Sequence, residues 1–244
     1  EQLLSRGASV LLVDRDPAAL DAASRRFSAA GLRLGTFVGD LTQAGDRARL
    51  VEQAGRWHGG VNALVNNAGV NHFGMFESQE PAQVELALAV NVQAPILLCR
   101  ALLPQLSRLD EAHIVNMGSV FGSIGYPGYA VYSATKFALR GFTEALRREL
   151  AGSSVQVHYL APRATRTRIN AAAVERMNAE LGVAMDDPSV VGVALCRMLE
   201  RGQAFAVVGW PEKLFARINA VLPGAVDGAL RKQLPVIRRY AGGG

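Results

Sequence analysis

The sequence predicts an α/β fold in which a doubly wound parallel sheet is covered by helices on both faces, giving three layers. Apolar runs of strand length alternate with longer segments of helical period along the chain. These runs are continuously apolar, which is typical of parallel strands buried on both faces. The 244 residues are 50% hydrophobic, which is enough to form one well-buried core.

The predicted strands and helices follow one another in regular alternation. Strands are expected at 8–14, 32–40, 61–69, 112–119, 154–162 and 204–209. Helices are expected at 17–30, 43–57, 81–108 and 129–151, and residues 163–200 are expected to be largely helical. No linker or internal repeat interrupts this order, so residues 1–210 are predicted to form one domain and residues 211–244 a C-terminal extension.

The first residues, "EQLLSRGASVLLVD", resemble the end of a helix that runs directly into a strand. A dinucleotide-binding unit begins one step earlier, with a strand, a glycine-rich turn and the start of a helix. No glycine-rich fingerprint precedes Gly7. Either about twenty residues precede this sequence or the domain lacks its central strand. If the molecule starts at Glu1, we expect weak or no dinucleotide binding.

The formal net charge of +5 is concentrated near the C-terminus. From residue 211 onward the cationic residues outnumber the carboxylates by four: Lys213, Arg217, Arg231, Lys232, Arg238 and Arg239 against Glu212 and Asp227. This distribution is not the broad basic stripe with interleaved aromatic residues that nucleic-acid binding needs. Nucleic acid is therefore not an expected partner.

Cysteine and histidine spacing predicts no metal site. Cys99 and Cys196 are far apart, and the four histidines show no ligand spacing. The two cysteines also form no disulfide framework, so we expect a reducing, cytoplasmic setting. The longest apolar segment, "LALAVNVQAPILLCRALLP", is interrupted by polar residues and proline, and it is not expected to span a membrane.

Tyr132 and Lys136 stand four positions apart in a predicted helix, so both side chains project from one face. A nearby ammonium favours the phenolate and is expected to bring the tyrosine pKa, normally near 10, toward neutrality. Ser119 ends a predicted strand thirteen residues before Tyr132. It belongs at the carboxyl edge of the sheet, where open α/β sheets bind ligands, as does "NNAG" at 66–69. Alone, Ser119 could cap the next helix and "NNAG" could be a simple turn.

Taken together, these residues resemble the short-chain dehydrogenase/reductase family in its shorter form of about 250 residues. The resemblance covers residues 1 to about 210, and implies a Rossmann-type domain. The matching positions, in order, are Asn66-Asn67-Ala68-Gly69, Asn91, Ser119, Tyr132-Ser133-Ala134-Thr135-Lys136, and Pro162 with Thr167.

The resemblance implies an NAD(P)-dependent oxidoreductase that acts on an alcohol/carbonyl pair. Tyr132 would exchange a proton with the substrate oxygen, and Ser119 would hydrogen-bond that oxygen. Lys136 would bind the nicotinamide ribose as well as tune Tyr132. Asn91 would hold a water that links Lys136 to solvent. The hydride chemistry would belong to the cofactor.

Asp14 is the residue that bears on the choice between NAD and NADP. Its carboxylate, at the end of a strand, can accept hydrogen bonds from both adenosine ribose hydroxyls and would repel a 2′-phosphate. Arg15 could pair with that phosphate instead. We favour NAD, with NADP as the alternative, because an unpaired carboxylate facing a phosphate is costly. Asp14 or Asp16 could also simply cap the next helix.

Further cofactor contacts follow from the resemblance. The carboxylate of Asp40 is expected to accept from the adenine amino group, and the full set of contacts is Asp14, Arg15, Asp40, Leu41, Asn67, Ala68, Gly69, Tyr132, Lys136, Pro162, Thr165 and Thr167. Family members commonly have Pro-Gly where this chain has Pro162-Arg163. Arg163 is therefore expected to place a charge near the site entrance.

The loop "VFGSIGYPGYA" at 120–130 is expected to form one wall of an apolar substrate pocket. Ser119, Phe121, Ile124 and Tyr126 would line it, around a small alcohol or ketone. The helical segment 165–200 would form a lid, with Met177 and Met185 either as adaptable contacts or as ordinary packing. By resemblance, helices 81–108 and 129–151 would form the contact of a homodimer or homotetramer.

The extension 211–244 mixes apolar residues with positive charge, and Pro211, Pro223 and Pro235 are expected to break it. It could form a subunit contact, a helix covering the pocket, or a short amphipathic helix on an anionic membrane surface, with a lipid-like substrate. A non-catalytic dinucleotide-fold protein, acting as a binding or scaffold module through this extension, is the alternative to an enzyme.

Overall fold

The computed structural model describes residues 1–28, 31, 33–167 and 172–242. All strand pairs in this part of the chain are parallel. The strands are β1 (Val10–Asp14), β2 (Leu34–Val38), β3 (Ala63–Asn66), β4 (Ala112–Met117), β5 (Val155–Ala161) and β6 (Phe205–Val207). The predicted strands and their parallel arrangement are confirmed; residue 32, which the second predicted strand includes, lies outside the described residues.

The helices alternate with these strands as predicted. They are α1 (Pro17–Ser28), α2 (Ala44–Arg56), α3 (Pro81–Leu88), α4 (Ala94–Leu106), α5 (Ala130–Glu149), α6 (Ala172–Glu180), α7 (Pro188–Glu200), α8 (Glu212–Val221) and α9 (Pro223–Ala241). Residues 29–30, at the end of the first predicted helix, and residues 168–171, within the segment expected to be helical, lie outside the described part. At the N-terminus, a single 3-10 turn over Leu4–Arg6 ends at Gly7, whose φ of 84° is left-handed.

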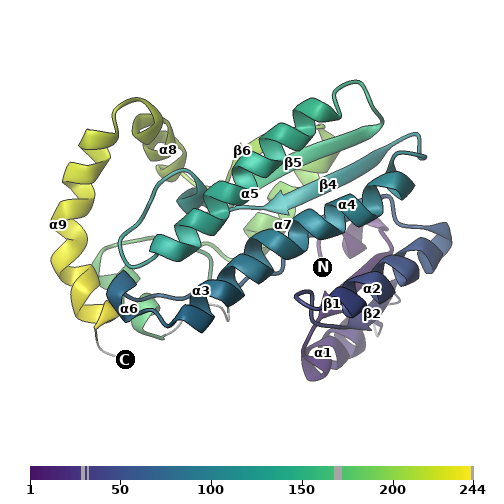
Figure 1. Ribbon diagram of the computed structural model, residues 1–244, viewed down its shortest axis with the longest axis horizontal. Coiled ribbons are helices and arrows are strands. Elements are labelled where there is room, and N and C mark those ends of the chain that lie inside the picture. Colours follow the sequence, from purple (N-terminus) through teal and green to yellow (C-terminus); the bar gives the residue numbers. More distant parts are fainter. Residues whose placement is uncertain (29–30, 32, 168–171, 243–244) are drawn as a thin grey trace.

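The described strands form two sheets. β1 pairs with β2, while the other four strands follow the order β3-β4-β5-β6. The smaller unit, β1 and β2 with α1 and α2, lies at one end of the molecule, drawn in purple and blue in Figure 1. Among the described residues no strand joins the two sheets.

Helices cover both faces of the larger sheet, which gives the three predicted layers. On one face Ile114 and Val157 pack with Leu102, Leu106 and Leu146 of α4 and α5. On the other face the neighbouring residues Val115 and Leu160 pack with Leu195 and Met198 of α7. Figure 1 shows α4 and α5 side by side in front of the strands. The alternation of successive side chains along a strand accounts for both cores.

The helical run Pro81–Leu106 is long and apolar enough for a membrane span by length and composition alone. In the structure Leu98, Cys99, Leu102 and Leu106 of this run are buried in the core of the domain. The run is also not one continuous α-helix, because a π-helical segment, Ala89–Gln93, separates α3 from α4. We therefore interpret it as a core helix, consistent with the sequence.

The C-terminal extension forms α8 and α9 and folds back on the domain. Val226 of α9 packs with Val120 and Ile124 of the loop after β4. Glu180 of α6 accepts hydrogen bonds from Arg239 (2.8 Å) and Tyr240 (2.9 Å). Figure 1 shows α9, in yellow, along the end of the molecule opposite β1 and β2. α9 thus covers the loop expected to line the substrate pocket.

The prolines of the extension do not all act as breaks. Pro211 precedes α8 and Pro223 occupies the first turn of α9, where a missing N–H costs nothing. Pro235, however, lies inside α9. The expectation that it breaks the chain is wrong.

Candidate active site

The candidate site lies where the strands of the larger sheet end. Because β3, β4 and β5 are parallel neighbours, the segments after them meet at one edge of the sheet. These segments contain Asn67–Gly69, Ser119 and Pro162, respectively. Two backbone bonds join the segments after β4 and β5: the N–H of Gly118 donates to Leu160 and that of Val120 to Pro162. The sheet edge thus brings together the motifs that the sequence indicated.

Tyr132 and Lys136 lie in the first turns of α5, directed at this edge. The Lys136 ammonium lies 5.6 Å from the centroid of the Tyr132 ring and donates to the carbonyl of Met117, the last residue of β4 (2.9 Å). Lys136 is only 5% exposed. The pair therefore faces the protein interior beside Ser119 and not bulk water.

The pKa of Tyr132 does not shift in the direction expected from the sequence. Burial raises it to about 12, although a hydrogen bond with Ser119 acts in the lowering direction. Burial also lowers the pKa of Lys136 from 10.5 to about 8. Desolvation disfavours the charged form of both groups, and it is the largest cause of both shifts. The prediction of an acidified Tyr132 is wrong for the protein without a bound cofactor.

Ser119 combines the two roles considered for it. It is the N-cap of a short 3-10 turn, Val120–Gly122, and its Oγ accepts from the N–H of Phe121 (3.1 Å). It also lies close enough to Tyr132 to act on the pKa of the phenol, in the lowering direction. The cap fixes the serine hydroxyl next to the phenol, so a structural bond sets the position of a candidate catalytic group.

Asn91 lies in the π-helical segment and is 1% exposed. Its Oδ1 accepts from the N–H of Val70 (2.8 Å), and its Nδ2 donates to the Val70 carbonyl (2.9 Å) and to Thr135 Oγ1 (3.1 Å). Its amide thereby holds the loop after β3 to helix α5. π-helical turns are frequent at functional sites, and the water-binding role of Asn91 stays a prediction.

Gly69 lies where these groups converge. A Cβ added at Gly69 would meet Asn91 Oδ1 at 3.3 Å and the Lys136 Nζ at 3.9 Å. Any larger residue would push into the space between the amide and the ammonium. The final glycine of "NNAG" is therefore required by close packing around the catalytic candidates.

A buried chain of amides stabilises the scaffold behind the site. Asn66 donates to Asn116 (2.8 Å), and Asn116 donates to Thr143 (2.9 Å), which itself donates to the carbonyl of Leu139. Asn66 also contacts the Sγ of Cys99. β3, β4 and α5 are thus joined by satisfied polar groups in the interior, which rigidify such a core.

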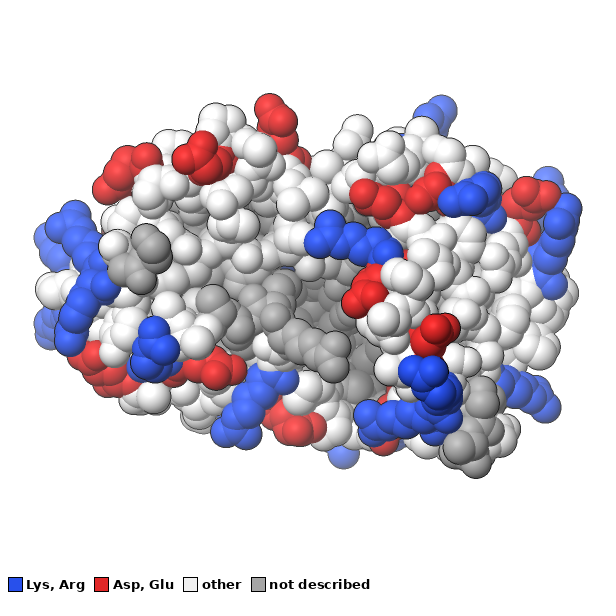
Figure 2. Space-filling model, turned by 90° about the horizontal axis from the view of Figure 1, so that it is seen from below, with Lys and Arg blue, Asp and Glu red and all other residues white. Residues whose placement is uncertain are grey.

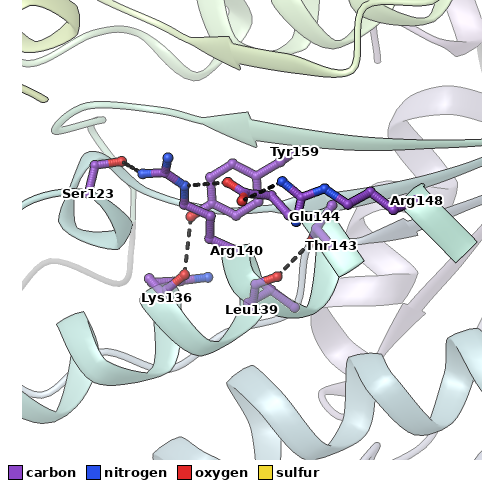
Figure 3. Close-up of polar contacts among 8 residues, drawn as sticks. All are labelled: Ser123, Lys136, Leu139, Arg140, Thr143, Glu144, Arg148 and Tyr159. Carbon is purple, nitrogen blue, oxygen red and sulfur yellow. Dashed lines mark hydrogen bonds and ion pairs between the residues drawn. The ribbon is translucent and has the colours of Figure 1, made fainter. Parts of the chain in front are cut away.

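A second polar network follows α5 away from the site (Figure 3). Arg140 donates to Glu144 (2.9 Å) and to Ser123 (2.7 Å), and Tyr159 donates to the carbonyl of Lys136 (3.2 Å). Figure 3 shows the Tyr159 ring beside the Arg140 side chain. The ring fits against glycine: a Cβ at Gly118 or Gly122 would collide with Tyr159.

The loop after Ser119 presents an aromatic cluster. Phe121 stacks on Tyr126 with 4.8 Å between ring centroids, and it approaches Tyr129 at 5.2 Å and Tyr132 at 6.4 Å. Ile124 is buried on the side toward α9, where it supports the loop from behind. Tyr126 donates to Gln233 of α9 (3.0 Å). Met177 is 1% exposed, which fits the ordinary-packing interpretation.

Comparison with known proteins agrees with this geometry. The family model for short chain dehydrogenases matches residues 1–178. The chain belongs to the short-chain dehydrogenase family.

Individual members of the family resemble the chain to different extents. The human protein "Dehydrogenase/reductase SDR family member 4" is 33% identical over 162 residues, covering 66% of this chain and 58% of that protein. The chain spans about three fifths of the first curated relatives, 58% to 60% of their length.

Two solved structures show the same fold with cofactor bound. The 3-ketoacyl-(acyl-carrier-protein) reductase from Brucella melitensis, complexed with NADH, has a TM-score of 0.79 at 26% identity; the match covers 86% of this chain and 90% of the other. A metagenomic short-chain oxidoreductase in complex with NADP has a TM-score of 0.71 at 29% identity, covering 85% and 88%. Both nicotinamide dinucleotides therefore occur among structural relatives in this family.

The residues present fit part of such a cofactor. Asp14, at the exposed end of β1, uses Oδ1 to accept from the N–H of Asp16, while Asp16 caps α1 through Ala18 and Ala19. The helix cap therefore belongs to Asp16, and the contact of Asp14 with the adenosine ribose stays a prediction. Arg15 is exposed beside it, and Asn67 and Ala68 are exposed after β3. No glycine-rich turn for the pyrophosphate occurs among the described residues.

The carboxylate of Asp40 is engaged in the structure. Its Oδ1 accepts from both the N–H and the hydroxyl of Thr42 (2.8 Å each), at the turn that leads to α2. Its backbone N–H donates to Asp46. Leu41 is partly buried beside it. The contact of Asp40 with adenine stays a prediction, because one oxygen already stabilises this turn.

Arg163 does not leave an unbalanced charge at the site entrance, contrary to the expectation from the sequence. Its guanidinium donates to both oxygens of Asp186 (2.9 and 2.6 Å) and lies 3.5 Å from Glu212. The Arg163 and Asp186 side chains are 17% and 13% exposed. Gly209 is needed beside them, because a Cβ there would meet the Arg163 side chain.

The ion pair between Arg163 and Asp186, which we call the clasp, orders the loop that follows β5. Thr165 forms an isolated parallel bridge with Asp186, and its hydroxyl donates to the carbonyl of Arg163 (2.9 Å). Thr167 is exposed at the end of the described loop. Arg163, where family members commonly have glycine, therefore holds the loop after β5 to the segment before α7.

Sequence reasoning missed three groups that shape the site: Thr135, Tyr129 and Asp186. Thr135 lies inside the Tyr-Lys motif and is fully buried as a partner of Asn91. Tyr129 is 3% exposed and contacts the rings of Phe121, Phe73 and Tyr132. The position of Tyr129 three residues before Tyr132 was an available signal, whereas the pairing of Asp186 depends on the tertiary fold.

Proposed function

We propose that the protein transfers a hydride between a nicotinamide dinucleotide and an alcohol/carbonyl group of an apolar substrate. The observation that carries this proposal lies at the carboxyl edge of a parallel sheet, where Lys136 and Asn91 meet at Gly69 and Tyr132 lies between Lys136 and Ser119. A bound nicotinamide would supply the hydride acceptor or donor.

The side chains of this chain would handle the proton. With a pKa of about 12, Tyr132 keeps its proton at neutral pH, so it is ready to act as an acid toward a carbonyl oxygen. Ser119 would hold that oxygen. Burial lowers the pKa of Lys136 to about 8. Its ammonium would therefore be charged, and donate hydrogen bonds to the cofactor ribose, only below that pH.

NAD is the favoured cofactor and NADP the alternative. Asp14 supports this proposal, because it stands exposed at the end of β1 and is not needed as the cap of α1. A carboxylate there would oppose a 2′-phosphate. Arg15 is the competing feature, since it could pair with that phosphate.

An apolar substrate fits the walls around Tyr132. Phe121, Tyr126 and Tyr129 present aromatic surface next to the phenol, and α9 closes the loop from behind. Figure 2 shows one face of the molecule, on which acidic and basic residues are interspersed. Such a surface favours an uncharged small molecule over a polyanion.

The decisive assay follows NADH and NADPH absorbance with a panel of ketones and aldehydes, and NAD with the matching alcohols. Tyr132→Phe is expected to abolish turnover while the circular dichroism spectrum stays unchanged. The matched control is Tyr126→Phe, which removes a hydroxyl bonded to Gln233 and should keep most of the activity. Retained turnover in Tyr132→Phe would remove Tyr132 from the mechanism. NADH binding without turnover across the panel would favour the binding module instead.

A homodimer or homotetramer in the cytoplasm completes the proposal. Leu86, Leu88 and Phe137 are exposed on α3 and α5, and apolar side chains of this kind suit a subunit contact. Light scattering of the protein and of a Leu88→Ser, Phe137→Ser variant would test this contact. A monomeric wild-type protein would contradict it.

A further inference from the structure

The outer face of α8 is an exposed apolar patch. Of the large hydrophobic side chains that are exposed among the described residues, five of eleven lie within residues 210–222: Trp210 (69%), Leu214 (41%), Phe215 (42%), Val221 (77%) and Leu222 (63%). Scattered exposed apolar residues need no explanation, but a cluster in so short a segment does. We call these five residues the α8 patch.

The inner face of α8 fixes its orientation. Ala216 and Ile218 pack against the cluster of Val120, Ile124 and Val226, and Asn219 donates to the carbonyl of Ser123 (2.9 Å). Helical periodicity then directs Leu214 and Val221 away from the domain. The α8 patch is thus presented outward by a helix that is itself well anchored.

Two cations share this outer face. Lys213, Arg217 and Val221 follow one another at intervals of four residues, so they form a row beside Leu214. Among the described residues neither cation takes part in an ion pair, and both are exposed. Glu212, the one carboxylate of α8, points instead to Arg163. The outer face therefore combines apolar groups with uncompensated positive charge.

This combination argues against a second copy of the chain as the partner. In a two-fold contact the patch would meet its own copy, whose five apolar residues include no carboxylate to pair with Lys213 and Arg217. Cations buried at an interface without such a partner cost free energy. The positive charge of Lys213 and Arg217 beside the α8 patch favours a negatively charged partner.

The shape of the patch favours a lipid surface over a protein groove. The three most exposed members, Trp210, Val221 and Leu222, lie at the two ends of α8 and protrude from the surface. In Figure 1, α8 and its turn into α9 lie at the periphery of the molecule. Protruding tryptophan, leucine and valine beside lysine and arginine are typical of helices that lie in the interface of an anionic bilayer.

We propose that α8 docks the protein on membranes that contain anionic phospholipids. Trp210, Leu214, Val221 and Leu222 insert at the level of the headgroups, and Lys213 and Arg217 contact the lipid phosphates. α9 stays packed on the domain in this arrangement, so docking needs no unfolding of the extension. The proposal does not depend on the oxidoreductase activity.

The test is co-sedimentation of the full chain with phosphatidylcholine vesicles that contain roughly a third phosphatidylserine, a proportion chosen to give a strongly negative surface. Binding is expected at low salt, with much weaker binding at high salt and to pure phosphatidylcholine. Lys213→Ala, Arg217→Ala should weaken binding about thirty-fold, since each basic residue near such a surface is worth roughly a factor of five. Val221→Ser, Leu222→Ser should also weaken it.

The matched control is Arg231→Ala, Lys232→Ala, which removes the same charge from exposed positions of α9. It should lower binding far less than the α8 variant. In a second measurement, a bromine-labelled lipid should quench the fluorescence of Trp210, and this quenching should be absent in Trp210→Phe. Absence of binding at low salt would overturn the proposal, as would equal losses in the α8 and α9 variants. A change in oligomeric state of Val221→Ser, Leu222→Ser would assign the patch to a subunit contact and also overturn it.

Discussion

Arg163 and Asp186 form a bidentate ion pair with N···O distances of 2.9 and 2.6 Å. The pair joins the loop after β5 to the segment before α7. Arg163 also donates to the carbonyl of Trp210 (3.3 Å), at the start of the extension. One side chain therefore ties together the loop after β5, the segment before α7 and the start of the extension. Arg163, the cation of this clasp, is the main local departure from the family motif.

Breaking the clasp should lower stability more than breaking a comparable surface pair. We expect Arg163→Gln to reduce the free energy of unfolding by about 1–3 kcal/mol, because Asp186 is left largely buried without its partner. Urea denaturation measures this. Arg239→Gln is the matched control: its pair with Glu180 is much more exposed, at 62% and 36%, so it should cost below about 1 kcal/mol. Equal losses would show that the clasp adds nothing specific.

Gly118 should tolerate no side chain. Gly118→Ala would press its Cβ against the Tyr159 ring, and forced overpacking of this kind costs about 1–3 kcal/mol. Because Gly118 precedes Ser119, we also expect reduced turnover. Gly125→Ala, in the same loop, is the control, since nothing lies within 4 Å of its added Cβ. Thermal unfolding of the two variants should differ clearly; matching transition temperatures would contradict the packing argument.

Asn91 should be needed for the stability of the fold as well as for catalysis. Asn91→Leu keeps a similar volume but leaves both backbone groups of Val70 without their partner, while the Thr135 hydroxyl keeps its bond to the Tyr132 carbonyl. Unsatisfied buried groups cost about 1–3 kcal/mol each, so a loss of several kcal/mol of stability is expected. Hydrogen exchange at the Val70 amide should speed up selectively. Unchanged protection of that amide would refute this role.

Stability should rise with pH because of Lys136. Burial lowers its pKa from 10.5 to about 8, whereas in the unfolded chain it stays protonated to about pH 10. Between these values the unfolded state binds more protons, so the free energy of unfolding increases with pH, by up to about 3 kcal/mol. Tyr132 acts oppositely, but only above about pH 10, because its pKa is raised to about 12.

Urea denaturation of the wild-type protein and of Lys136→Met at pH values from about 7 to 9.5 tests this linkage. Other ionisable groups are common to both proteins and cancel in the difference. The wild-type stability should rise relative to the variant above about pH 8. Parallel pH profiles would mean that Lys136 titrates normally in the folded state.

Asp14 should decide between the two dinucleotides. Asp14→Ser removes the charge that opposes a 2′-phosphate and leaves Arg15 in place, so the preference should shift toward NADP by about tenfold. The ratio of kcat/KM for NADH and NADPH measures the change. Asp16→Ser, which alters the cap of α1, should leave that ratio unaffected. An identical ratio in Asp14→Ser and the wild type would assign selectivity elsewhere.

The sequence by itself determined the order of strands and helices, the parallel sheet and the family. It also placed Tyr132 and Lys136 on one face of α5, because an interval of four residues has a fixed geometry in any helix. Ser119 at the end of β4 and "NNAG" after β3 followed from the same local rules, since the carboxyl ends of parallel strands share an edge.

Only the tertiary structure decided how these groups behave. Arg163 and Asp186 stand 23 positions apart, so no local pattern could predict that the charge of Arg163 would be paired with a carboxylate. The pKa of Tyr132 depends on how many protein atoms replace water around it. Burial raises this pKa although Lys136 lies one helical turn away. The side of α8 that faces solvent likewise followed from its packing on the loop after Ser119. Contacts and desolvation are properties of the assembled chain, whereas helical and strand periodicity are properties of its segments.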